Sequence, residues 1–381
     1  MKTSLAVICS VMCLQLFSCT ASTDSSGLAA PFRAKIVAHD STGYSLQTVT
    51  FKTLTDVDSV VGTYAYLSGN SIIDAQAELS ANTVVGDDSL YIDPGSDLRI
   101  DYSVDEDNVV IPRNFDSMDA LAIYYTYESV LDYWITNFGF TVADFGRLRL
   151  QYAPRIQMRN QNSQISQAIK LNAAFLPGSR DFLMFRTSAL ESVPFNLNLG
   201  VIAHEFGHAV FDYKFAGKDA TFYDADSDIS DDNLSGMNEG LSDYFSFMMT
   251  GRTIDFAESD SSFSLERVPP VSWKLSTLQS TIDAGGCNGS YYCKGSILAS
   301  ALHELAVGKQ MGLLPIGKLA YEGLEQMRSD WLAHRDDGTF DYHFLLNAIL
   351  EQATSEQQQT MCTVFTKWFD TAEFIEKLNC K

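Results

Sequence analysis

The stretch VIAHEFGHAV, residues 201–210, places two histidines four positions apart, with a glutamate directly after the first. Each residue of an α-helix turns by about 100°, so His204 and His208 would share one face and both rings could reach one metal ion. Glu205 would lie beside them, where a carboxylate can act on a water at that ion. The apolar flanks predict a buried helix, in which Gly207 permits close approach of another backbone. The alternative is a core helix whose histidines are only hydrogen-bonded.

A catalytic zinc site needs a third protein ligand. Residues 209–218 contain no histidine, which excludes a third histidine shortly downstream. The segment SGMNEGLSDYF, residues 235–245, offers Glu239 instead. Asp243, four residues later, shares a helix face with Glu239 and can accept the second ring N–H of a zinc-binding histidine. Alone, this segment would indicate an amphipathic helix with solvated acids. Together with the histidines it predicts a site of two histidines and one glutamate.

The motifs HEFGHAVFDY and NEGLSDYF resemble those of the thermolysin-like zinc metallopeptidases, the gluzincins. The resemblance extends over about residues 110–310. It implies an α+β fold, in which an N-terminal β-rich region precedes a two-lobed peptidase with a mostly helical C-terminal lobe. It also implies a role for each motif residue. Zinc would be held by His204, His208 and Glu239, catalysis would use Glu205, and Asn238 and Asp243 would support the ligands.

The segment NAAFLPGSRDFLMF, residues 172–185, resembles the family's edge strand, whose backbone holds the substrate as an added strand. This resemblance implies substrate contacts at Asn172, Ala173 and Ala174. The segment at residues 115–140 resembles the long helix that precedes that strand.

The sequence departs from the family where the oxyanion histidine is expected. In the family this histidine lies four residues before a glycine that opens a later helix. The matching glycine here is Gly295, which puts Tyr291 at the histidine position and Tyr292 beside it. A phenol can also donate a hydrogen bond to a developing oxyanion. Arg267 either matches the family arginine that holds the substrate carbonyl or is a plain surface arginine.

The charge balance is strongly acidic, with 26 basic and 48 acidic residues and a net charge of −22. This argues against binding to nucleic acid or to anionic membranes, and it would attract cationic substrates. The acidic stretch DADSDISDD, residues 224–232, lengthens the chain between the two zinc motifs. It could bind calcium, but it lacks the glycine and terminal glutamate of an EF-hand loop. A solvated loop is the alternative.

The N-terminus predicts an exported protein. Residues 1–18 combine one lysine with an apolar stretch that is too short for an ordinary membrane span, as in a signal peptide. LFSC, residues 16–19, resembles a bacterial lipobox, which implies lipid on Cys19 and a flexible tether over residues 19–30. Thr20 fits an outer-membrane lipoprotein. Ordinary cleavage, which would give a secreted protein, is the alternative.

Four of the seven cysteines lie outside this leader, at Cys287, Cys293, Cys362 and Cys380. Four cysteines allow three pairings. Closeness in sequence favours Cys287 with Cys293 and Cys362 with Cys380, and export permits disulfides. The alternative is free buried thiols.

Hydrophobic periodicity divides the chain into a β-rich part and a helical part. Residues 31–110 alternate in short runs and predict strands, forming either an accessory sandwich or the β half of a peptidase lobe. Residues 111–381 would form the peptidase domain, with an α+β lobe to about residue 215. A helix is expected from a cap at Asp116 or Ser117 to a stop at Gly139. Strands are expected near 147–153 and 181–186, and helices at 237–250, 295–307, 315–328, 341–353 and 358–378.

The predicted function is a zinc endopeptidase that hydrolyses proteins outside the cytoplasm with a metal-activated water. The aminopeptidase branch of the gluzincins uses a Gly-x-Met-Glu-Asn strand, which this sequence lacks. The alternative from another class is a lipid-tethered binding protein that keeps the fold but is catalytically impaired. The intact Glu205 opposes this alternative, whereas the missing histidine favours it. We expect a monomer with protein or peptide substrates, no nucleic acid partner, and membrane contact only through a lipid anchor.

Overall fold

The computed structural model describes residues 31–40, 43–74, 91–159, 165–168, 173–177, 179–185, 193–217, 232–253, 258–259, 267–287, 290–334 and 339–380. Within them, sheets predominate in the first half and helices in the second, so the predicted α+β class is confirmed. The strands are β1 (Arg33–Asp40), β2 (Gly43–Thr50), β3 (Leu54–Asp56), β4 (Val61–Gly62), β5 (Ala65–Gly69), β6 (Ile72–Asp74), β7 (Tyr91–Asp93), β8 (Ser96–Asp97), β9 (Tyr102–Val104), β10 (Val109–Pro112), β11 (Leu148–Tyr152), β12 (Arg155–Arg159), β13 (Ile165–Ala168), β14 (Ala173–Leu176) and β15 (Asp181–Met184).

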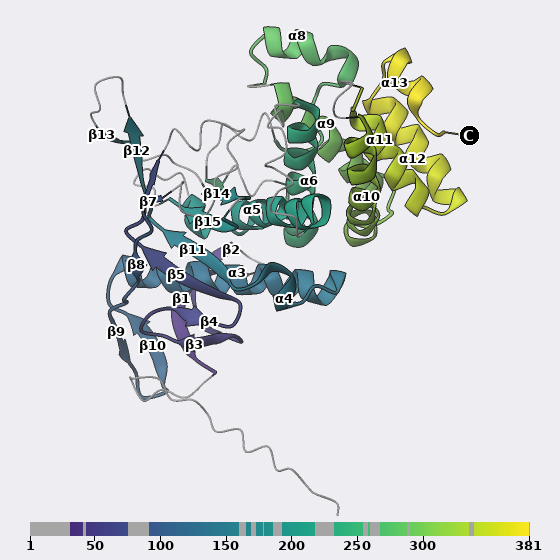
Figure 1. The fold of residues 1–381 in the computed structure, drawn as a ribbon. Coiled ribbons are helices and arrows are strands. Elements are labelled where there is room, and N and C mark those ends of the chain that lie inside the picture. The colour runs from purple at the N-terminus through teal and green to yellow at the C-terminus, as the bar shows by residue number, and fades with distance from the viewer. Residues whose placement is uncertain are drawn as a thin grey trace, which may run out of the picture.

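The α-helices are α3 (Phe115–Phe138), α4 (Val142–Phe145), α5 (Leu199–Phe211), α6 (Asp232–Thr250), α8 (Leu278–Asp283), α9 (Ser290–His303), α10 (Leu313–His334), α11 (Tyr342–Gln352), α12 (Ser355–Trp368) and α13 (Ala372–Lys377). Short 3₁₀ turns lie at Phe195–Leu197 and Leu275–Thr277, and π turns at Asp212–Ala216 and Glu304–Gly308. Figure 1 shows the sheets on one side and helices α8 to α13 on the other, with α5 and α6 between them.

The sheet that leads to α5 joins strands from distant parts of the sequence. Its order is β14-β15-β11-β5-β4-β3, with β8 paired to β5. β5 pairs in parallel with β11, opposing Ala65 to Leu148, and β11 pairs in parallel with β15. The strands β3, β4, β5 and β8 of the N-terminal region therefore share one sheet with the later strands β11, β14 and β15. β14 is an edge strand of this sheet, because among the described strands it pairs only with β15.

The two other sheets have the orders β2-β1-β10-β9 and β13-β12-β6-β7. β1 shows the predicted alternation, because Ala34, Ile36 and Ala38 are buried while Arg33 and Lys35 are exposed. Such a strand lays one face on the core and the other toward water.

Several predicted element boundaries were wrong by a few residues. α3 is capped by Asn114, whose side chain accepts from Ser117 N, and not by Asp116 or Ser117. Its end at Gly139 is confirmed, since this glycine takes the left-handed conformation with φ 72°. α9 begins at Ser290, five residues before Gly295. Tyr291 and Tyr292 therefore lie in its first turn.

The predicted helix at 358–378 is two helices, α12 and α13, separated near Asp370. The Asp370 carboxylate accepts hydrogen bonds from Ser276 N and Ser276 Oγ, each at 2.9 Å. These hydrogen bonds fix the chain between α12 and α13 to the turn at Leu275–Thr277. The local helical pattern could not indicate a contact with so distant a segment.

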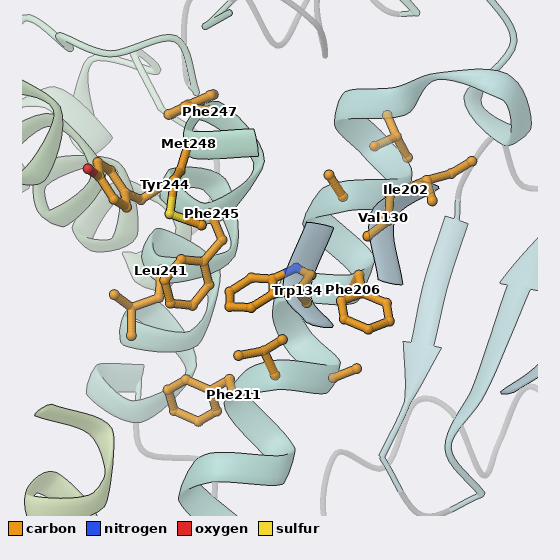
Figure 2. Packing of buried hydrophobic residues seen from close by; sticks show 14 of the residues in the cluster. Val130, Trp134, Ile202, Phe206, Phe211, Leu241, Tyr244, Phe245, Phe247 and Met248 are labelled. Atoms are coloured by element: carbon orange, nitrogen blue, oxygen red, sulfur yellow. The ribbon is translucent and has the colours of Figure 1, made fainter. Parts of the chain in front are cut away.

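The core between the sheets and the C-terminal helices is centred on Trp134 of α3. Figure 2 shows its indole between Phe206 of α5 and Phe245 of α6. The ring centroids are 6.3 Å and 5.1 Å from those two phenylalanines, and Trp134 is 1% exposed. Aromatic pairs at such distances add to the free energy of burying apolar area. Trp134 thus joins the long helix to both helices that carry the candidate metal ligands.

Replacing Trp134 by Ala is expected to lower the free energy of unfolding by about 3–5 kcal/mol, because it leaves a large cavity at this junction. Denaturant unfolding followed by circular dichroism measures the loss. Phe115→Ala is the matched control, since Phe115 is 71% exposed and its removal should change stability by less than about 0.5 kcal/mol. Equal stability of wild type and Trp134→Ala would contradict the central role of this residue.

The C-terminal helical part contains both disulfides that closeness in sequence favours. Cys287 bonds to Cys293 and Cys362 to Cys380. The first bond closes the segment that leads into α9, and the second ties α12 to the C-terminal segment. Among the described helices, none combines the length and apolar content that crossing a membrane requires.

Candidate metal centre

α5 carries both candidate histidine ligands, His204 and His208, and its first turn is capped by Asn198. The Asn198 side-chain oxygen accepts from Gly200 N at 2.9 Å and from Val201 N at 3.2 Å. These bonds satisfy donors that the first turn of a helix leaves unpaired. From this start, His204 and His208 project from one face, and their ring centroids are 4.5 Å apart.

α6 packs closely against α5 because Gly207 has no side chain. A Cβ atom at this position would lie 2.7 Å from Ser242 Cα, closer than real Cβ contacts. Ser246 Oγ also donates to Gly200 O at 2.8 Å, which ties the same two helices together. This close approach brings the α6 residues Asn238, Glu239, Ser242 and Asp243 to the two histidines.

His204, His208 and Glu239 each direct a possible ligand atom toward one point. Together they form a group whose ligand atoms all lie within 4.8 Å of one another. His204 Nε2 is 3.4 Å from Glu239 Oε2, and His208 Nε2 is 3.8 Å from Glu239 Oε1. Ligand atoms of a tetrahedral zinc site lie about 3.4 Å apart, given bonds of about 2.0–2.2 Å. The two distances from Glu239 are close to this spacing, and the three residue types are ones that bind zinc.

The second nitrogen of each imidazole faces a supporting residue. His204 Nδ1 lies 2.9 Å from Asp243 Oδ1, and His208 Nδ1 lies 2.9 Å from Asn238 Oδ1. Ser242 Oγ is 3.0 Å from the same His208 nitrogen. With the proton on Nδ1, each Nε2 presents a lone pair to the metal position. The contact from Ser242 was not predicted, although Ser242 follows Asn238 by one helical turn and shares its face.

Arg267 packs against this group, with its side chain only 11% exposed, and is not a plain surface arginine. Its Nη2 donates to Glu239 Oε2 and to Asp243 Oδ1, both at 2.7 Å. Burial acts to raise the pKa of Glu239, but Arg267 and then the two histidines outweigh it and hold that pKa well below the ordinary value. Glu239 is therefore an anion over the whole neutral range.

The charges act on His204 in the opposite direction. Burial and Arg267 lower the pKa of His204, but its hydrogen bonds to Asp243 and Glu239 outweigh them and raise it to about 9. A metal that binds His204 must displace this proton, so metal binding at neutral pH releases a proton.

Glu205 lies next to the ligand group and contacts the edge strand. Its Oε2 accepts from the backbone N of Phe175 in β14 at 2.9 Å, and Glu205 is 7% exposed. Since Phe175 donates this N–H away from its partner strand β15, the outer edge of β14 faces α5. Ala173 and Ala174 belong to the same strand.

The two tyrosines lie at the beginning of α9, near Arg267. The Tyr292 ring centroid is 5.2 Å from Arg267 Cζ, and the Tyr291 and Tyr292 centroids are 4.2 Å apart. Burial, and then the negative charge of Glu239, raise the pKa of Tyr292 far above its ordinary value. Tyr292 therefore keeps its hydroxyl proton at neutral pH and can donate it in a hydrogen bond.

α9 is held against α6 by a second close contact between backbones. A Cβ atom on Gly240 would lie 2.4 Å from Gly295 O. Gly295 therefore serves as a point of helix packing, and this packing sets the distance from Tyr292 to the ligand helix.

Some predicted site residues lie outside the described residues, namely Asn172, Cys19 and the acidic stretch up to residue 231. The other histidines, His39, His303, His334 and His343, do not join a metal-binding group within the described residues.

The chain matches no protein-family model and no curated protein. Among solved structures it is similar to the precursor of protealysin, a metalloproteinase from Serratia proteamaculans, with 11% sequence identity and a TM-score of 0.36. The match covers 81% of this chain and 89% of that one. A likeness at this level does not decide function, so the functional argument depends on the geometry of the metal centre.

Proposed function

We propose that this protein is a zinc-dependent endopeptidase that hydrolyses peptide bonds of proteins outside the cytoplasm. The observation that carries this proposal is the convergence of His204, His208 and Glu239, with Glu205 directly after His204 on the same helix. Two imidazoles and one carboxylate are a ligand set of hydrolytic zinc sites, which keep one position for water. Glu205 is not one of these ligands and is left for proton transfer.

A zinc ion held by His204, His208 and Glu239 would supply Lewis-acid chemistry toward a carbonyl oxygen and toward water. Glu205 accepts the proton of the attacking water and passes it to the leaving amine. The N–H of Phe175 fixes the Glu205 carboxylate at 2.9 Å, which orients it before substrate arrives.

The edge strand β14 supports an extended substrate. A peptide that pairs with its outer edge would run past Glu205, because this edge already contacts the Glu205 carboxylate through Phe175. Main-chain pairing of this kind depends little on the side chains of the peptide. Ala173 and Ala174 would contribute backbone groups to it.

Tyr292 is the group that we propose in place of the oxyanion histidine of the thermolysin-like peptidases. It is protonated, it lies beside Arg267, and it is held by the packing of α9 on α6. A donor that is already in position costs little reorganisation when negative charge develops on the carbonyl oxygen.

Tyr292→Phe is expected to lower kcat by about 10²- to 10³-fold, with zinc content and KM little changed, because a hydrogen bond to the developing oxyanion is lost. Tyr291→Phe is the matched comparison and should have a smaller effect, since its ring packs on Tyr292. Steady-state kinetics on one peptide measures both. Near wild-type kcat in both variants and in the double variant would show that neither tyrosine stabilises the oxyanion.

A further inference from the structure

The guanidinium of Arg267 lies on the same side chains that would hold the metal. Its Nη2 is 2.7 Å from Glu239 Oε2 and 3.4 Å from His204 Nε2, which are two of the candidate ligand atoms. The same guanidinium contacts Asp243 through Nη2 at 2.7 Å and through Nε at 3.2 Å. The Arg267 side chain is 11% exposed and that of Asp243 2%, so water screens these charges weakly.

This arrangement places the Arg267 guanidinium and the His204 ring against the carboxylates of Glu239 and Asp243. Buried carboxylates require a compensating charge, and Arg267 supplies part of it. A divalent metal on His204, His208 and Glu239 would supply the same compensation from a neighbouring position. The metal and the guanidinium would then be like charges a few ångströms apart in a poorly screened site, where their repulsion is substantial.

We propose that Arg267 is a resident counterion that competes with zinc for Glu239. It stabilises the metal-free protein, keeps the ligand set assembled before metal arrives, and lowers the affinity for zinc so that the metal can be loaded and exchanged. This role rests on the proposed zinc site, and it is separate from any contact of Arg267 with a substrate carbonyl.

The test is the dissociation constant of zinc, measured by competition with a chromophoric chelator on the full chain at one pH. Arg267→Gln is expected to bind zinc about tenfold more tightly than wild type, because a nearby positive charge is removed. Arg267→Lys keeps the cation and should stay within about threefold of wild type. Arg113→Gln is the matched control, since Arg113 pairs with Asp101 at an exposed site and should not change zinc affinity.

Thermal unfolding of the same proteins provides a second readout that does not use activity. Metal-free Arg267→Gln should unfold at a lower temperature than metal-free wild type, and saturating zinc should reduce that difference. If metal-free Arg267→Gln does not fold, the protein is purified with zinc, and slower zinc release than from wild type is expected.

Two results would overturn the inference in different ways. If wild type binds zinc but Arg267→Gln binds it equally or more weakly, or if Arg267→Lys also gains tenfold, Arg267 is not a competing counterion and the metal site stands. If neither wild type nor Arg113→Gln binds zinc, the proposed function fails, and the role of Arg267 fails with it.

Discussion

Glu205→Gln is expected to lower kcat for peptide hydrolysis by about 10²- to 10⁴-fold while leaving about one zinc per chain. The amide keeps the size of the side chain but cannot take a proton from water. Glu205 lies beside the ligand group and does not belong to it, so the metal should stay bound. Parallel measurements of peptide cleavage and of zinc by atomic spectrometry separate these two effects.

Glu325→Gln is the matched control for this substitution. Glu325 lies on α10, and its side chain is 75% exposed in a pair with Lys214. This variant should cleave peptides like wild type. Full activity of Glu205→Gln would show that Glu205 is not the general base and that another residue takes the proton from water.

Glu239→Ala is expected to lose nearly all bound zinc and, with it, all measurable hydrolysis. The substitution removes one of the three ligands, and two histidines alone do not complete a catalytic zinc site. It also removes one of the carboxylates that Arg267 contacts, so the metal-free protein should be less stable. Zinc content after dialysis against metal-free buffer measures the loss directly.

Asp243→Asn provides the graded comparison for Glu239→Ala. Asp243 supports His204 through a contact of 2.9 Å and is not a ligand, so its variant should weaken zinc binding by about 10- to 100-fold without abolishing it. Equal zinc occupancy in Glu239→Ala and wild type would show that Glu239 is not the third ligand.

Local spacing was enough to predict the parts of the site that lie on single helices. His204 and His208 are one turn apart, as are Glu239 and Asp243, so each pair shares a face in any regular helix. The close packing of α5 on α6 could also be predicted from the sequence, because Gly207 has no side chain. The space that a side chain would fill is occupied by Ser242. These predictions depended only on helix geometry and on residue size.

The contacts that involve distant segments could not be predicted in this way. The position of Arg267 against Glu239 and Asp243 depends on the course of the chain after α6, which no periodicity specifies. The N–H of Phe175 reaches Glu205 only because β14 is the outer strand of its sheet in the described part of the chain.

Strand order and helix ends could not be predicted from local sequence, because they too depend on contacts between distant segments. β5 pairs with β11 across a large separation in sequence, and alternation alone gives a strand no preferred partner. α9 was predicted to open at Gly295, but this glycine serves the contact with Gly240, and the helix begins at Ser290. A glycine can mark a close backbone approach as well as a helix boundary.

We propose that this chain hydrolyses peptide bonds with a zinc ion held by His204, His208 and Glu239. The most direct measurement is cleavage of an unstructured protein by the purified wild type, before chelation, after chelation and after zinc is restored. We predict cleavage that is lost on chelation and returns with about one equivalent of zinc. Wild-type protein that holds zinc but leaves the substrate uncut would contradict the claim and favour a binding protein.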